Sequence, residues 1–146
     1  HVYDYVEPFQ EVKETLQYLH QQGYKMGIVT TKFVQGALDG LRDFQLDHYF
    51  DVIIGLDSVV DHKPHPEGIL KALQALQVAP SQAVFIGDNA TDIIAGNSAG
   101  VKSIGIGWSP KGTEPLVQAK PYTIIDKMST LIKIIKKIDE HATNTL

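Results

Sequence analysis

Short apolar runs alternate along the chain with segments in which apolar residues recur every three or four positions. A short continuous apolar run is typical of a buried strand, whereas a helix that covers a sheet needs one apolar stripe. The pattern predicts strands over 25–30, 51–55, 83–86, 102–106 and 121–125, and helices over 8–22, 33–44, 67–76, 91–99 and 128–138. This alternation predicts an α/β fold with a Rossmann-like parallel sheet and helices on both faces.

Three residues near the predicted helix ends carry further local signals. Pro8 suits the first turn of a helix, because proline lacks the N–H that the first turn leaves unpaired in any case. Gly23 and Gly100 suit the position directly after a helix, where the backbone often turns left-handed. We therefore expect one helix to begin at Pro8 and end before Gly23, and another to end before Gly100.

Length and composition limit the class of protein. With 146 residues and 43% hydrophobic content, the chain suits a single domain over residues 1–146 with a core of ordinary size. The net charge of −4 and the lack of a basic run longer than Lys136-Lys137 give no support for nucleic-acid binding. The absence of cysteine excludes disulfides and thiolate metal sites. Without a run of about 20 apolar residues or an apolar leader, we expect a cytoplasmic protein that binds no membrane.

Two carboxylates, Asp88 and Asp92, lie where the predicted strand 83–86 gives way to a helix. Two acids that converge on one point repel each other unless a cation neutralises them or one of them holds a proton. Oxygen ligands without sulfur or imidazole favour Mg²⁺. The pattern therefore predicts a cation site, and the alternative is that the acids only cap the helix and complement its dipole.

Polar residues also follow two earlier apolar runs. Thr30, Thr31 and Lys32 end the predicted strand 25–30, and Lys63 lies in the loop Lys63-Pro64-His65-Pro66. The carboxyl ends of parallel strands share one edge of a sheet, where hydroxyls, an ammonium and paired carboxylates form a site for a phosphate with its metal. The alternatives are that Thr30 caps a helix and that Lys32 and Lys63 are surface charges.

In their order and spacing these segments resemble the haloacid dehalogenase superfamily of phosphohydrolases, in particular its phosphoglycolate phosphatase and pyrophosphatase branch. The resemblance covers nearly the whole chain. It rests on residues 8–12, 27–32, 63–66, 87–92 and 95–100.

The resemblance implies roles for six residues of this chain. Thr30 would bind the transferred phosphoryl group, with Thr31 and Lys32 beside it in a form typical of the pyrophosphatases. Lys63 would hold the charges of the nucleophile and the phosphate together. Asp88 would bind Mg²⁺, and Asp92 would support the ion directly or through water.

One part of the family pattern is missing. In the family an aspartate attacks phosphorus, and a second aspartate two residues further on acts as acid and base. That Asp-x-Asp motif should close a strand before Pro8 and be followed by a helical cap domain, whereas here Asp4 is followed two places later by Val6. We therefore assign no nucleophile, and we expect the chain to be the C-terminal part of a phosphatase that is inactive alone.

By the same resemblance the absent strand lies in mid-sheet, between the strand that ends at Thr30 and the one that ends at Gly87. Its absence leaves two interior edges, and exposed strand edges pair readily with other chains. We expect the sheet to be completed by residues outside 1–146, by strand exchange in a homo-oligomer, or by rearranged pairing of the two strands.

Several functions stay open on the sequence. The leading one is Mg²⁺-dependent hydrolysis of a phosphorylated small molecule, either a phosphate monoester or a pyrophosphate. The alternative is a non-catalytic phosphate-binding, metal-binding or assembly module of the same fold. A receiver-type signalling domain fits less well because Lys63 precedes Asp88, and a dinucleotide-binding fold fits least because no glycine fingerprint follows the first strand.

Overall fold

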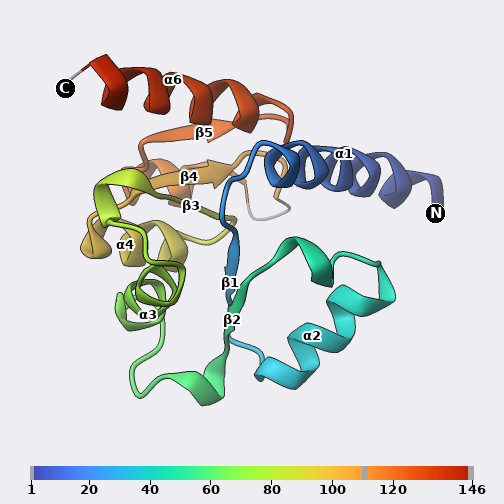
Figure 1. The fold of residues 1–146 in the computed structure, drawn as a ribbon, viewed down its shortest axis with the longest axis horizontal. Coiled ribbons are helices and arrows are strands. Elements are labelled where there is room, and N and C mark those ends of the chain that lie inside the picture. Colours follow the sequence, from blue (N-terminus) through green and yellow to red (C-terminus); the bar gives the residue numbers. More distant parts are fainter. Residues whose placement is uncertain (1, 110–111, 145–146) are drawn as a thin grey trace.

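The structure, a computed structural model, describes residues 2–109 and 112–144 (Figure 1). Its helices are α1 (Val2–Gln21), α2 (Val34–Asp43), α3 (Glu67–Leu76), α4 (Ala90–Ala99), α5 (Glu114–Gln118) and α6 (Thr130–Asn144). Its strands are β1 (Gly27–Val29), β2 (Val52–Ile54), β3 (Val84–Gly87), β4 (Lys102–Ile106) and β5 (Thr123–Ile125). The predicted alternation of strands and helices is confirmed, and the short helix α5 is an addition to it.

The strands form two parallel sheets instead of one. β1 pairs with β2, with Val29 opposite Ile54, and the second sheet has the order β3-β4-β5, with Gly87 opposite Gly105. The predicted parallel α/β fold is confirmed, but β1 and β3 do not pair with each other. Among the described residues, the expected rearranged pairing of these two strands therefore does not occur.

The ends of α1 and α4 agree with the predictions from glycine, whereas the start of α1 differs from the prediction from Pro8. Gly23 has a φ of 84° after α1 and Gly100 a φ of 82° after α4, the left-handed conformation that glycine adopts without strain. Pro8, in contrast, lies inside α1, which begins at Val2. Proline removes one backbone donor and weakens a helix interior without preventing helical φ, so it did not mark the start.

The side chains of β3 alternate between two apolar clusters, which shows that helices cover both faces of its sheet. Phe85 packs against residues of α3 and α4, whereas Val84 and Ile86 pack against the cluster formed by Leu19, Ile104, Ile125 and Leu131. Figure 1 shows α3 and α4 on one side of this sheet and α1 and α6 on the other. None of the described helices combines the length and the apolar character that a bilayer crossing requires.

A cleft of about 610 Å³ lies between β1 and β3. Ile28 and Val29 line one side of it, Val84 and Ile86 line the other, and apolar side chains of α1, α3 and α6 close it. The cleft is therefore at the mid-sheet position where the sequence predicted a missing strand.

Candidate functional site

Lys63 joins the carboxyl ends of the two sheets. Its Nζ lies 2.6 Å from Oδ1 of Asp92, which follows β3, and 3.4 Å from the carbonyl oxygen of Val29, the last residue of β1. The two side chains of the ion pair are only 14% and 7% exposed. The Nζ also lies 5.8 Å from the ring centre of Phe85. The structure thus brings together two of the residues that the sequence singled out, Lys63 and Asp92.

Asp92 has a partner for each of its carboxylate oxygens. Oδ1 accepts from Lys63, and Oδ2 accepts from the backbone N–H of Asn89 at 3.2 Å, which caps the start of α4. The capping alternative therefore accounts for one oxygen of Asp92 and the ion pair for the other. Space for this carboxylate depends on Gly87, where an added Cβ would lie 2.3 Å from the Cβ of Asp92.

Asp88 lies at the turn between β3 and α4 and is exposed. Its Oδ1 accepts from Nδ2 of Asn89 at 3.1 Å. Within residues 2–109 and 112–144, no three His, Cys, Asp or Glu side chains are grouped so that they could hold a metal ion. Mg²⁺ commonly takes only one or two carboxylates and completes its shell with water and substrate phosphate. The exposed carboxylate of Asp88 fits that pattern, whereas the oxygens of Asp92 already have donors.

Thr30 continues the pairing of β1 with β2, since its N–H donates to the carbonyl of Ile54 at 2.9 Å. Its Oγ1 accepts from the N–H of Lys32 at 3.2 Å, and the side chains of Thr31 and Lys32 are exposed. The alternative in which Thr30 caps the following helix is wrong, because the N-cap position of α2 is Phe33.

Asp57 caps the start of α2, the role that the sequence had suggested as an alternative for Thr30. Its Oδ1 accepts from the N–H of Val34, the first residue of α2, at 3.0 Å. The sequence analysis missed this contact because Asp57 is 23 residues away from Val34 and reaches it only through the pairing of β1 with β2.

Thr30, Thr31 and Lys63 line one small cavity, with Asp61 and His62 from the loop that precedes Lys63. Its volume is about 10 Å³, roughly that of one water. Lys63 is therefore the link between the threonine residues after β1 and the carboxylate after β3. Lys32 and Asp88, which the sequence also singled out, do not line this cavity, and both are exposed.

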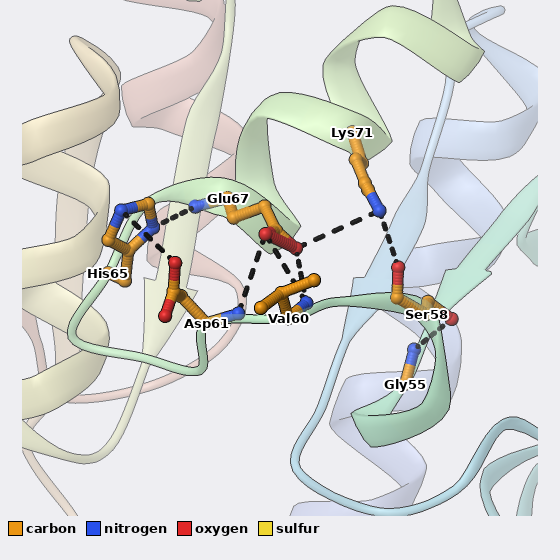
Figure 2. Close-up of polar contacts among 7 residues, drawn as sticks. All are labelled: Gly55, Ser58, Val60, Asp61, His65, Glu67 and Lys71. Atoms are coloured by element: carbon orange, nitrogen blue, oxygen red, sulfur yellow. Dashed lines mark hydrogen bonds and ion pairs between the residues drawn. The ribbon is translucent and has the colours of Figure 1, made fainter.

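Glu67 holds the loop that carries Lys63 (Figure 2). Its carboxylate accepts from the backbone N–H of Val60 at 2.8 Å and of Asp61 at 3.4 Å, and the Nζ of Lys71 lies 3.7 Å away. The sequence analysis did not select Glu67. The feature that could have identified it is an acidic residue at the first position of α3, directly after a loop with two prolines.

The surroundings of Glu67 favour the ionised form of its carboxyl. Burial raises the pKa of this carboxyl, but the hydrogen bonds from Val60 and Asp61 and the charge of Lys71 outweigh it, so that the pKa lies below its usual value. His65 adds a further contact, because its Nδ1 accepts from the N–H of Glu67 at 3.1 Å (Figure 2). The carboxylate of Glu67 therefore ties Val60 and Asp61 to the start of α3, and its backbone N–H holds His65.

Comparison with known proteins supports the same family that the motifs resemble. Residues 1–106 match the model of the family described as haloacid dehalogenase-like hydrolase. The pyrophosphatase PpaX of Bacillus mycoides (strain KBAB4) is 44% identical over 134 residues, which are 92% of this chain and 62% of the relative. The pyrophosphatase PpaX of Bacillus cereus (strain ATCC 10987 / NRS 248) is 45% identical over the same shares.

Solved structures show the same likeness. A predicted phosphoglycolate phosphatase from Haemophilus somnus 129pt has a TM-score of 0.78 and 34% identity, over 85% of this chain and 55% of that chain. A beta-phosphoglucomutase from Clostridium difficile has a TM-score of 0.76 and 26% identity, over 91% of this chain and 57% of that chain. The chain spans less than two thirds of the length of these proteins. On the match of its residues 1–106, the chain belongs to the haloacid dehalogenase-like hydrolase family.

Proposed function

We propose that the chain is part of a Mg²⁺-dependent phosphohydrolase that cleaves a phosphate monoester or a pyrophosphate, and that residues 1–146 supply its phosphate-binding and metal-binding side chains. The observation that carries the proposal is the position of the Lys63 ammonium, between the end of β1 and Asp92. The family and the pyrophosphatases among the relatives support the reaction class.

Lys63 and Thr30 are the residues that bind the phosphoryl group in this proposal. An ammonium has three N–H donors, of which Asp92 and the carbonyl of Val29 take two, so that the third is available to an anionic oxygen. The hydroxyl of Thr30 accepts from Lys32 and keeps its own hydrogen for a phosphate oxygen. Thr31 and Lys32, exposed beside it, add a hydroxyl and a positive charge for a second phosphate.

Asp88 is the residue that holds Mg²⁺ in this proposal, together with water and phosphate oxygens. When bound, the ion neutralises negative charge on the phosphoryl group. Asp92 acts mainly on Lys63, which it holds in place through the contact between Nζ and Oδ1, and it would support the ion only indirectly. No residue of 1–146 is assigned as the nucleophile, so we expect this part to bind phosphate without turnover.

The proposal is tested by binding and by turnover on the 146-residue chain. Calorimetric titration should show that Thr30→Val weakens orthophosphate binding about tenfold, the loss of one hydrogen bond to a charged group. Thr123→Val on β5, away from the site, is the matched control and should bind phosphate unchanged. Asp88→Asn should weaken Mg²⁺ binding and leave the fold intact. Equal phosphate binding by both threonine variants would overturn the phosphate site, and Mg²⁺ binding unchanged in Asp88→Asn would overturn the metal site.

The second candidate, a non-catalytic phosphate-binding or metal-binding module, rests on the fact that both oxygens of Asp92 already have donors within the chain. Release of phosphate separates the two candidates. The chain should release none from an aryl phosphate or from pyrophosphate with Mg²⁺ when it is alone, and should do so when the rest of the polypeptide is present. Binding without turnover in the longer polypeptide would favour the non-catalytic module.

A further inference from the structure

Asp57 lies in the loop after β2, outside the residues assigned above to phosphate and metal binding, and it contacts the segment that carries Thr30. We propose that Asp57 is a positioning residue for the phosphate site: it fixes segment 30–34 so that the hydroxyl of Thr30 keeps its hydrogen for a phosphate oxygen. This role rests on the proposed function, in which Thr30 binds the phosphoryl group.

Backbone hydrogen bonds hold the beginning of segment 30–34 against the loop that follows β2. The N–H of Thr30 donates to the carbonyl of Ile54 at 2.9 Å, and the carbonyl of Lys32 accepts from the N–H of Leu56 at 2.8 Å. These two bonds continue the parallel pairing of β1 with β2 beyond the ends of the strands. They fix the part of the segment that carries the hydroxyl of Thr30.

Asp57 fixes the other end of the segment. Its Oδ1 accepts from the N–H of Val34 at 3.0 Å, where α2 begins. Phe33, at the N-cap position of α2, has a hydrocarbon side chain that cannot accept a hydrogen bond, so this N–H needs an acceptor from elsewhere. Because Asp57 belongs to the loop after β2, the bond joins α2 to that loop, which a local cap at position 33 would not do.

Gly55 shows how closely the segment and the loop approach each other. A Cβ added at Gly55 would lie 2.7 Å from the carbonyl oxygen of Lys32, 2.7 Å from the backbone nitrogen of Val34 and 2.9 Å from Oδ1 of Asp57. Each of these distances is shorter than a Cβ contact allows unless the neighbouring atom moves. The lack of a side chain at Gly55 therefore lets the loop come close enough for Asp57 to reach Val34.

The loop that carries Asp57 is itself anchored, so it can act as a fixed support. Oγ of Ser58 accepts from the N–H of Gly55 at 3.0 Å, and the carbonyl of Ser58 accepts from Nζ of Lys71 at 2.6 Å (Figure 2). Lys71 belongs to α3, which contacts both β1 and β2. Asp57 thus connects segment 30–34 to a helix that packs on the sheet.

The hydroxyl of Thr30 depends on the position of this segment because it both accepts and donates. Its Oγ1 accepts from the N–H of Lys32 at 3.2 Å, which leaves the hydroxyl hydrogen for a phosphate oxygen. When Val34 is released, Lys32 can turn away from Oγ1, and the hydroxyl must then be oriented anew as phosphate binds. The affinity for phosphate falls in proportion to the fraction of molecules that hold the productive arrangement.

Calorimetric titration of the 146-residue chain with orthophosphate tests this role. Asp57→Ala removes the acceptor and should weaken phosphate binding about fivefold, the equivalent of one helix cap. Asp57→Asn keeps a side-chain oxygen that can accept from Val34, so it should bind phosphate within about twofold of the parent chain. Asp43→Ala, which removes an exposed aspartate from the opposite end of α2, is the matched control and should bind phosphate unchanged.

A double-mutant cycle with Thr30→Val separates positioning from support of the fold alone. If Asp57 acts through the hydroxyl of Thr30, Asp57→Ala should weaken phosphate binding less than about twofold once Thr30→Val has removed that hydroxyl. Amide hydrogen exchange gives a second measurement. The N–H groups of Lys32 and Val34 should exchange faster in Asp57→Ala than in the parent chain, and Asp57→Asn should restore their protection.

Three results would overturn the role of Asp57. If Asp57→Ala binds phosphate like the parent chain while Thr30→Val binds it more weakly, the role is refuted and the proposed function stands. Equal losses from Asp57→Ala with and without the Thr30 hydroxyl would show that Asp57 supports only the fold. Unchanged binding by Thr30→Val would refute the phosphate site itself, and the role of Asp57 with it.

Discussion

The ammonium of Lys63 lies 2.6 Å from Oδ1 of Asp92, although the two residues are 29 positions apart in the chain. Both side chains are largely buried, so each charge depends on the other for compensation. The pair also fixes the 60–66 loop to the start of α4, and it thereby places the ammonium at the carboxyl ends of both sheets. Removing one partner should therefore affect the whole fold.

Asp92→Asn should lower the free energy of unfolding by about 3–5 kcal/mol, because the variant leaves the Lys63 ammonium buried without its counter-charge. Urea unfolding measures this value. The control is Asp88→Asn, an exposed change that should stay within about 0.5 kcal/mol of the parent chain. Equal losses for the two variants would show that the ion pair is not the stabilising contact.

Gly87→Ala should destabilise the protein by about 2 kcal/mol or more, because the new Cβ would lie 2.3 Å from the Cβ of Asp92 and 2.5 Å from its Oδ2. Gly40→Ala on α2 is the control. Nothing lies within 4 Å of a Cβ added there, so alanine should stabilise the helix by about 0.5–1 kcal/mol. Thermal unfolding should give opposite signs for the two variants, and a neutral Gly87→Ala would contradict the packing seen here.

Glu67→Gln should change how the free energy of unfolding depends on pH. The folded state lowers the pKa of Glu67 from 4.5, so the ionised carboxylate stabilises the fold fully above that pH, and the contribution is lost as pH falls through the lowered pKa. The variant lacks this contribution, so its deficit relative to the parent chain should shrink below about pH 4. Urea unfolding from neutral to acidic pH measures both curves.

Glu140→Gln on the exposed side of α6 serves as the control for Glu67→Gln. It should leave the acid dependence of stability unchanged, since among residues 2–109 and 112–144 no backbone N–H donates to it in the way that Val60 and Asp61 donate to Glu67. A deficit of Glu67→Gln that stays constant with pH would mean that the shape of the side chain, and not its charge, holds the loop.

Tyr24→Phe should remove the hydrogen bond that the hydroxyl donates to the carboxylate of Asp139, which links the turn after α1 to α6. The expected loss is about 1 kcal/mol at neutral pH. This bond raises the pKa of Tyr24 to about 12, so its contribution is complete below pH 10 and declines as pH rises toward 12. Tyr122→Phe, at an exposed ring, is the control and should change stability little at any pH. A loss for Tyr24→Phe that persists undiminished at high pH would contradict this account.

The order and type of the helices and strands could be predicted from sequence because interactions between residues close in the chain largely determine them. An apolar run or stripe already specifies whether a segment can be buried as a strand or as one face of a helix. The glycine positions after α1 and α4 were predictable for the same reason, since a left-handed residue is a local requirement. The start of α1 was not, because proline only weakens a helix whose extent other contacts decide.

The candidate site was predictable only in part. The sequence identified Thr30, Lys63 and Asp92 as strand-end residues of one sheet edge, and the structure shows Lys63 in contact with Asp92 and in one cavity with Thr30. For Asp92 the sequence favoured a cation site over a helix cap, whereas in the structure one oxygen of Asp92 contacts Lys63 and the other accepts from the N–H of Asn89. Glu67 was missed because its partners are backbone groups of a loop, which carry no sequence signature.

By itself the sequence determined which segments are buried, where two of the helices end, and which polar residues follow the strands, because each depends on neighbours within a few positions. The separation of β1 and β3 around an apolar cleft, and the connection of their ends by Lys63, became visible only in the folded chain. The physical reason is that strand pairing and ion pairing join residues far apart in the chain, and their free energy depends on distances that no local pattern specifies.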